Sequence, residues 1–173
     1  MVKGKLLFTH FGISGPTVLN MSREIGELLK YGEVVIMLDI FPKLAHGALK
    51  QKLQTLLVGE SNKKLKNVLN QLIPAALVSS LLELAHIDGE TANHSVKSEE
   101  RVKLVALMKS IPLHVSGLLG ASKAIVSSGG VALPEVNFKT MQSRIALNIY
   151  IIGDVLNIDR PSGGYSLQLC WTT

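Results

Sequence analysis

The feature that most constrains this chain is a run of leucine-rich segments with helical spacing between residues 42 and 110. In the segment LKQKLQTLL, leucines recur every three or four positions, which places them on one face of a helix. The segments LKNVLNQLI, PAALVSSLLELA and SEERVKLVALMKS follow it. Pro74 opens the third segment, and Ser98 as N-cap, followed by Glu99 and Glu100, marks the start of the fourth. The sequence therefore predicts four short amphipathic helices in a small, bundle-like lobe.

Strand-like segments flank this helical run on both sides. Before it, KLLFTH and EVVIMLDIF are typical of strands, and the helix between them is expected to start at Ser14 as N-cap, with Pro16 in its first turn, and to end at Gly32. After it come IPLHV, KAIVSSGGVAL and NIYIIGD, and the continuously apolar NIYIIGD is typical of a strand covered on both faces. The order of strands, helices and strands predicts an α+β chain in which a helical lobe interrupts a β-containing framework.

Composition argues against several classes of protein. The net charge is +5, but the lysines are spread along the chain and only 5% of residues are aromatic. Because no basic and aromatic residues interleave as a stacking platform requires, we expect no nucleic-acid partner. No apolar stretch approaches the roughly 20 residues of a membrane span, and the first residues do not resemble a secretory signal. The single cysteine, Cys170, excludes an internal disulfide, so we expect a cytoplasmic protein.

Common catalytic motifs do not occur in the sequence. None of the five histidines has the spacing of an HExxH metal site, so we expect no metal. The GxSxG elbow, the Walker loop and the GxGxxG dinucleotide fingerprint do not occur either. A hydrolase, a kinase or a self-contained nucleotide-binding enzyme therefore has little support. His10, beside glycine-rich turns, is the one histidine that stays a catalytic candidate.

Two glycine-bearing stretches that precede the tail, THFGISGP and VSSGGV, are candidate binding sites. THFGISGP brings two glycines to a helix start where backbone N–H groups converge, but a tight strand-to-helix turn explains this stretch better than an anion site. VSSGGV contains Gly129 and Gly130, which permit positive φ angles or a close approach of two backbones. Each stretch alone is weak evidence for a binding site.

The tail carries a more specific combination. Gly153 and Asp154 follow an apolar segment, and a carboxylate at the end of a strand accepts hydrogen bonds from sugar-like hydroxyl groups. Gly163-Gly164-Tyr165 then precedes a helix-like run and offers bare N–H groups to a negatively polarised ligand atom. A loop followed by a surface helix is the plainer explanation of the same residues.

Three of these stretches together resemble a known family. GKLLFTHFGISGPTVL, VSSGGV and IYIIGDVLNIDRPSGGYSLQ are similar, in this order and spacing, to the BaiN/RdsA-like (YhiN-type) flavoproteins, also described as NAD(P)/FAD-dependent oxidoreductases or aminoacetone oxidases. The resemblance implies a β-rich, barrel-like domain at residues 1–41 and 111–123, a helical insert at 42–110, and the C-terminal part of an FAD-binding α/β domain at 124–173. The family's N-terminal βαβ unit, with its GxGxxG loop, is expected to precede residue 1.

The resemblance also assigns cofactor-binding residues. The implied FAD-binding residues are Gly129, Gly130, Gly153, Asp154, Gly163, Gly164, Tyr165 and Gln168. It implies that Gly153 and Asp154 bind the ribityl or phosphate portion of FAD, and that the helix after the second glycine pair faces the isoalloxazine ring. A helix N-terminus there stabilises the negative charge of a reduced flavin. Two features depart from the family: Ser166 replaces the usual asparagine, and the usual glycine-rich continuation after Trp171 is missing.

These observations favour one function over two alternatives. We expect a fragment of a flavin-dependent oxidoreductase that transfers hydride between FAD and a small substrate or NAD(P)H, inactive and nearly free of FAD by itself. His10 and Tyr165 are the catalytic candidates. The first alternative is a non-catalytic module whose helical lobe docks a partner protein, and nucleic-acid binding is the least favoured. The apolar segment NIYIIG, without its sheet neighbours, is expected to cause dimerisation, strand exchange or disorder at one end.

Overall fold

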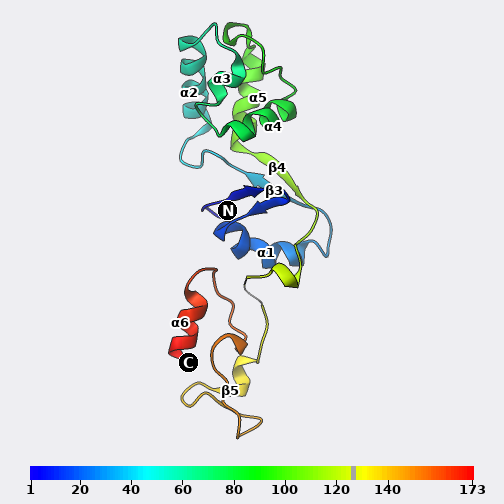
Figure 1. The fold of residues 1–173 in the computed structure, drawn as a ribbon, viewed down its shortest axis with the longest axis vertical. Coiled ribbons are helices and arrows are strands. Elements are labelled where there is room, and N and C mark those ends of the chain that lie inside the picture. The colour runs from blue at the N-terminus through cyan, green and yellow to red at the C-terminus, as the bar shows by residue number, and fades with distance from the viewer. Residues whose placement is uncertain (126–127) are drawn as a thin grey trace. The chain divides into compact units, whose positions relative to one another are not determined.

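The computed structural model describes residues 1–125 and 128–173, which divide into two compact units (Figure 1). Unit 1 combines Met1–Val34 with Ser116–Thr173, and unit 2 is Val35–Val115. Val126 and Ser127, the first residues of the VSSGGV motif, lie outside the described residues. Unit 2 is thus inserted in the sequence of unit 1, and the assignment of these parts to functional domains stays a prediction.

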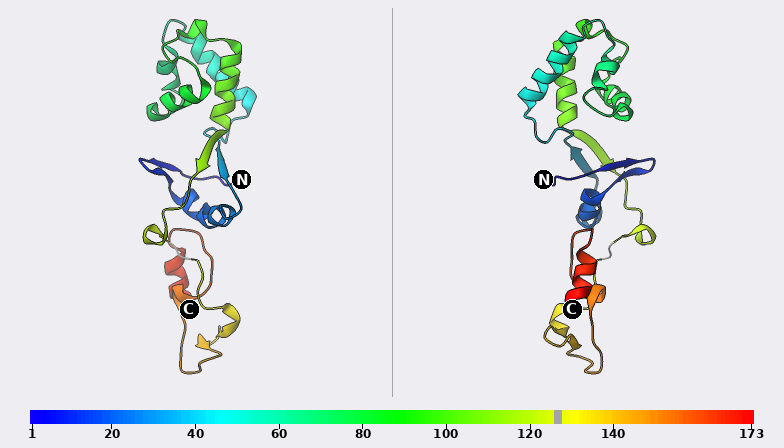
Figure 2. Two further views of the ribbon diagram at one scale, coloured as in Figure 1. Left: turned by 90° about the vertical axis from the view of Figure 1, so that its right-hand side faces the viewer. Right: turned by 60° about the vertical axis from the view of Figure 1, so that its left-hand side comes forward.

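Unit 2 contains the four helices that the leucine spacing predicts. They are α2 (His46–Gly59), α3 (Leu65–Leu69), α4 (Ala75–Ala85) and α5 (Ser98–Lys109), with a short 3-10 turn, η1 (Asn93–Ser95), before α5. Strands β3 (Val34–Leu38) and β4 (Ile111–Val115) pair with each other where the chain enters and leaves the helices. Leu49, Leu53 and Leu57 of α2 are buried in the core. Helices α2 and α5 pack side by side, and α4 packs against α5 (Figure 2).

One lysine ties the entry of the helical unit to its exit. The Lys109 Nζ, at the end of α5, donates hydrogen bonds to Asp39 Oδ2 at 2.5 Å, to the Phe41 carbonyl at 2.9 Å and to the Leu44 carbonyl at 2.8 Å. Its side chain is only 10% exposed. Since three acceptors satisfy the three ammonium donors, this buried charge is compensated by the loop that leads from β3 into α2.

The N-terminal part of unit 1 is a hairpin followed by a helix. Strands β1 (Leu7–Thr9) and β2 (Gly12–Ser14) pair in antiparallel fashion, and α1 (Pro16–Leu28) begins at the expected proline. The prediction of Ser14 as N-cap is wrong. Gly15 occupies that position with φ of 103°, and a Cβ there would lie 3.1 Å from the Lys5 carbonyl oxygen, so only glycine fits the turn.

The C-terminal part of unit 1 consists of short elements. They are η2 (Ala121–Lys123), η3 (Leu133–Glu135), β5 (Val136–Asn137), β6 (Gln142–Ser143), η4 (Gly153–Val155) and α6 (Tyr165–Thr172). The expected strand NIYIIGD does not form. Tyr150 makes one isolated bridge with Gln142 of β6, and this two-residue strand is too short to cover the segment, so that Ile149 and Ile152 stay exposed.

The overall class is α+β, as predicted, but the strands are few. Within residues 1–125 and 128–173 they form only two-stranded pairs, β1–β2, β3–β4 and β5–β6, and no closed barrel. The core of unit 2 is extensive, whereas unit 1 buries few apolar side chains, among them Ile25, Val136 and Leu156. A β-rich, barrel-like domain therefore stays a prediction.

Candidate functional site

The predicted glycine pair lies directly before α6 and leaves the helix start open. Gly163 has φ of 109°, Gly164 is the N-cap, and a Cβ at either position would meet no atom within 4 Å. The first N–H groups of a helix have no intrahelical acceptor, and they lie at the positive end of the helix dipole. Tyr165 and Gln168 are exposed on this helix. The start of α6 is therefore suited to receive a negatively polarised group.

The predicted Gly153-Asp154 pair lies against the other end of the same helix. Gly153 is buried with φ of 68°, and its N–H donates to Thr173 Oγ1 at 2.8 Å. A Cβ on Gly153 would lie 2.9 Å from Cys170 Sγ, so a side chain there would displace α6. The Asp154 side chain stays exposed to solvent. The structure thus places Gly153-Asp154 and Gly163-Gly164 at opposite ends of α6.

Arg160 connects these two ends, and sequence analysis did not single it out. Its guanidinium forms an ion pair with Asp154, and its Nε donates to Ser166 Oγ at 2.8 Å. A third N–H group donates to the Ile158 carbonyl at 2.7 Å, and the side chain is only 9% exposed. Ser166, which the sequence comparison above marks as a departure from the resembled family, is therefore engaged by Arg160. No motif or spacing rule marks such an arginine in advance.

At the glycine pair Gly129-Gly130, the backbone closely approaches the backbone around Val155. Gly130 has φ of 135°, and a Cβ there would overlap the Val155 carbonyl oxygen. The next residue, Val131, donates to that oxygen at 2.8 Å and accepts from the Asn157 N–H at 3.0 Å. Gly129 has open space around it. The need for glycine at position 130 follows from packing within the chain, and a role for either glycine in binding FAD stays a prediction.

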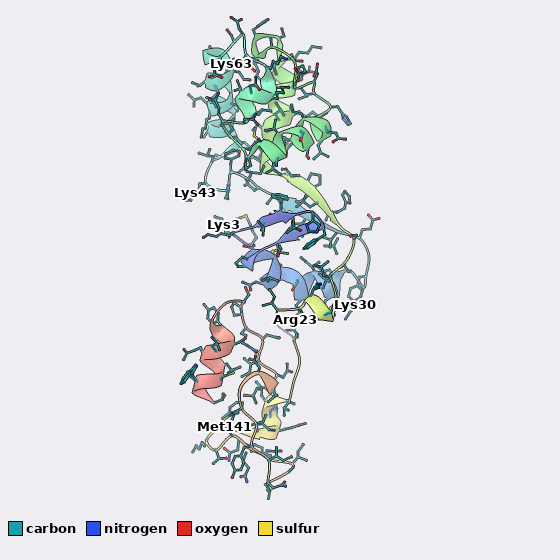
Figure 3. All side chains as sticks on the ribbon, viewed as in Figure 1. Lys3, Arg23, Lys30, Lys43, Lys63 and Met141 are labelled. Carbon is teal, nitrogen blue, oxygen red and sulfur yellow. The ribbon has the colours of Figure 1, made fainter. Side chains whose placement is uncertain are left out.

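Polar side chains of α1 hold the loop that precedes the second glycine pair. Asn20 Oδ1 accepts a hydrogen bond from the Ser162 N–H at 2.7 Å, and Arg23, labelled in Figure 3, forms an ion pair with Asp159. Asp159 also accepts from Ser128 Oγ at 3.2 Å. Contacts from the N-terminal part of unit 1 therefore restrain the loop that leads into α6.

The two catalytic candidates lie on different elements. His10 is exposed in the turn of the β1–β2 hairpin, where its ring meets Phe11 edge to face with centroids 4.8 Å apart. Tyr165 is exposed at the first position of α6. No hydrogen bond joins the two side chains among the described residues, so a catalytic role for either one stays a prediction.

The described part of the chain offers neither a metal site nor a membrane-spanning helix. Residues 1–125 and 128–173 contain no group of three His, Cys, Asp or Glu side chains arranged to hold a metal ion. None of the helices described there is long and apolar enough to cross a membrane.

Comparison with known proteins places these features in context. The family described as "HI0933-like protein barrel and H2TH domain" matches residues 1–126. The 3-dehydro-bile acid delta(4,6)-reductase of Clostridium scindens is 30% identical over 171 residues, which cover 98% of this chain and 42% of the relative.

Two further relatives act on RNA, according to their names. The ribosomal RNA dihydrouridine synthase of Escherichia coli is 30% identical over 168 residues, covering 97% of this chain and 40% of the relative. The enzyme of the same name from Haemophilus influenzae is 31% identical over 172 residues, covering 98% of this chain and 40% of the relative. The chain therefore spans about two-fifths of the length of the curated relatives it matches.

Proposed function

Because this chain belongs to the HI0933-like protein barrel and H2TH domain family, we propose that it forms part of a flavin-dependent reductase. The observation that carries the proposal is the tail array, in which Asp154, Arg160 and the open start of α6 are joined by hydrogen bonds. The same segment carries the resemblance to the FAD-binding residues of flavoproteins.

The names of the relatives support a specific reaction class. A delta(4,6)-reductase acting on a 3-dehydro-bile acid and a dihydrouridine synthase both reduce a carbon–carbon double bond conjugated to a carbonyl group. We infer that the whole protein reduces a double bond of this type. When bound, FAD supplies the hydride carrier for such a reduction.

The residues of the tail fit part of a flavin. The space beside Gly163 and Gly164 lets a ring edge approach the first N–H groups of α6, which stabilise negative charge there. Asp154 keeps an exposed carboxylate for hydroxyl groups, and Arg160 offsets its charge, so that a phosphate-bearing group is not repelled. A GxGxxG loop for the pyrophosphate does not occur in the sequence.

A chimera tests this proposal. This chain replaces the matching two-fifths of the Escherichia coli relative, and the purified chimera is assayed for bound flavin and for double-bond reduction. We expect flavin to be retained, and Gly164→Val to release it because the new side chain blocks the start of α6. Gly59→Val is the matched control, since Gly59 also has open space around it but lies in α2. A folded but colourless chimera, or flavin retained in Gly164→Val, would refute the proposal.

The chain by itself is expected to behave differently. Without a pyrophosphate-binding loop it should purify with little or no FAD and show no reductase activity. Visible flavin absorbance near stoichiometric occupancy in the purified chain would contradict this expectation.

The alternative function, a non-catalytic interaction module, has one observation in its favour. Unit 1 exposes large apolar side chains, including Phe11, Tyr31 and Trp171. Such side chains are typical anchors of protein interfaces. A chimera that binds no flavin, together with a chain that forms a stoichiometric complex with another protein, would favour the module.

A further inference from the structure

The positive charge of the helical unit is distributed unevenly over its surface. On the α3 side, Lys63 pairs with Glu60 at 3.0 Å, Lys64 pairs with Glu90 at 2.5 Å, and Lys66 also pairs with Glu90. These hydrogen bonds, from Lys64 first and then Lys66, lower the pKa of Glu90 to about 2. Each of these three lysines is therefore engaged by a neighbouring carboxylate, and Lys64 and Lys66 share the same one.

The unpaired cations lie on α2, on α5 and in the segments that lead into them. Within residues 35–115, all of which the structure describes, the cations without an ion pair are Lys43, Lys50, Lys52, Lys97, Arg101 and Lys103. Helix α2 contains no acidic residue. Helices α2 and α5 pack side by side (Figure 2). Because Glu99 and Glu100 in the first turn of α5 offset cations of that helix, the excess positive charge of the pair lies mainly on α2.

The outward face of α2 is polar and closely approachable. Its buried leucines fix the orientation of the helix, so that Gly47, Ala48, Gln51 and Thr55 are exposed. A shallow concavity of about 420 Å³ is lined by Ala48, Gln51, Lys52, Thr55 and Leu56. At 100° per residue, Lys50 and Lys52 fall on either side of Gln51. Two cations therefore flank a strip of small and hydrogen-bonding side chains.

We propose that the exposed face of α2 binds the sugar–phosphate backbone of a structured RNA, with Lys50 and Lys52 contacting phosphates and Gln51 and Thr55 contacting sugar hydroxyls. Lysines neutralise phosphates, amide and hydroxyl side chains bond to backbone oxygens, and small residues let the helix come close. The proposal rests on the reductase function above, in the form that the two RNA-modifying relatives carry out.

The chemistry of α2 favours folded RNA over other acidic partners. The helix has no Phe, Tyr or Trp, so it lacks the large aromatic anchors of protein interfaces and a row of stacking platforms for single-stranded bases. Double-helical RNA is bound mostly through its shape, phosphates and 2′-hydroxyl groups, which this face can reach. The sequence alone led to the opposite expectation, because the even spread of lysines along the chain conceals which of them are paired.

The test is a salt titration of the full chain with a fluorescently labelled RNA duplex, followed by anisotropy. We expect wild-type binding to weaken steeply with salt, and Lys50→Gln with Lys52→Gln to reduce the slope of log K against log salt by about two, one for each lysine. The matched control, Lys63→Gln with Lys64→Gln, removes the same charge from paired lysines and should leave the slope unchanged. Lys63 lies at the far end of the helical unit from Lys43 (Figure 3).

Two further arms exclude trivial explanations. Gln51→Glu places one negative charge on the same exposed face and should weaken binding at least several-fold while the circular dichroism spectrum is unchanged. Polyglutamate should fail to displace the RNA. Equal losses in the control pair, displacement by polyglutamate, or no salt-dependent binding of the wild-type chain would overturn the proposal. None of these measurements involves flavin, so their failure is distinct from loss of flavin in the chimera.

Discussion

Lys109 offers the most direct test of how the helical unit is held together. Replacing it by methionine keeps an unbranched side chain of similar length but removes the donor of three hydrogen bonds, to Asp39, Phe41 and Leu44. Leaving a buried acceptor unsatisfied costs about 1–3 kcal/mol. Asp39 is 31% exposed, so water regains part of this loss at the carboxylate.

We therefore expect Lys109→Met to lower the free energy of unfolding by about 2–4 kcal/mol. This corresponds to a roughly 30- to 700-fold larger unfolding constant, since 1.4 kcal/mol is about tenfold. Such a loss is a large share of the 5–15 kcal/mol that typically stabilises a domain. Urea titration of the full chain, followed by far-ultraviolet circular dichroism, measures it as a lower midpoint.

The matched control is Lys103→Met on the same helix. Lys103 is exposed and has no ion pair within residues 35–115, so its replacement should change the free energy of unfolding by less than about 0.5 kcal/mol. Asp39→Asn combined with Lys109→Met should cost less than the sum of the two single changes, because both remove the same ion pair. Equal effects of the two lysine replacements would refute the conclusion that the hydrogen bonds of Lys109 stabilise the helical unit.

Three other changes follow from local geometry and charge. Hydrogen bonds from Lys64 and Lys66 lower the pKa of Glu90 from 4.5 to about 2 in the folded chain. The ionised carboxylate therefore stabilises the folded state above pH 4.5, and this contribution is lost as the pH falls toward 2. Urea midpoints measured across this range should fall less steeply in Glu90→Gln than in wild type. His86 ends α4 in the left-handed region with φ of 53°, and His86→Gly should raise the free energy of unfolding by roughly 0.5–1 kcal/mol; a lower urea midpoint would contradict this. Gly130→Ala should cost about 2 kcal/mol or more in the C-terminal part of unit 1, seen as faster amide hydrogen exchange there, and unchanged exchange would show that the backbones do not approach as described.

The helical unit could be predicted because its signal is local. The leucines of α2 recur at helical spacing, and Leu49, Leu53 and Leu57 are all buried. The exact helix ends were less predictable. The N-cap of α5 is Lys97 and not the expected Ser98, which is the first residue of the helix, and the Lys97 N–H donates to Glu100 Oε2 at 2.7 Å. Helix ends depend on which side chain reaches a free N–H group, and neighbouring polar residues compete for that role.

The tail was harder to predict because its structure depends on distant partners. An apolar run such as NIYIIGD becomes a strand only if other strands pair with it, and the described residues supply a single bridge at Tyr150. Gly163 and Gly164 were found where expected, since a glycine pair before a helix is a local signal. Arg160 was missed because its contacts with Asp154 and Ser166 follow from the path of the loop and from no spacing rule.

The pairing of β3 with β4 has a consequence for the order in which the chain folds. The two sequence segments of unit 1 are separated by the whole of Val35–Val115, and the entropy cost of closing a flexible loop grows with its length. Once the helical unit has formed from its mainly local contacts, the strand pair holds its two ends together, and the flexible loop that unit 1 must close becomes much shorter. Unit 2 is therefore expected to gain protection first in pulse-labelling during refolding, and unit 1 to follow at a rate that slows when the β3–β4 pair is weakened.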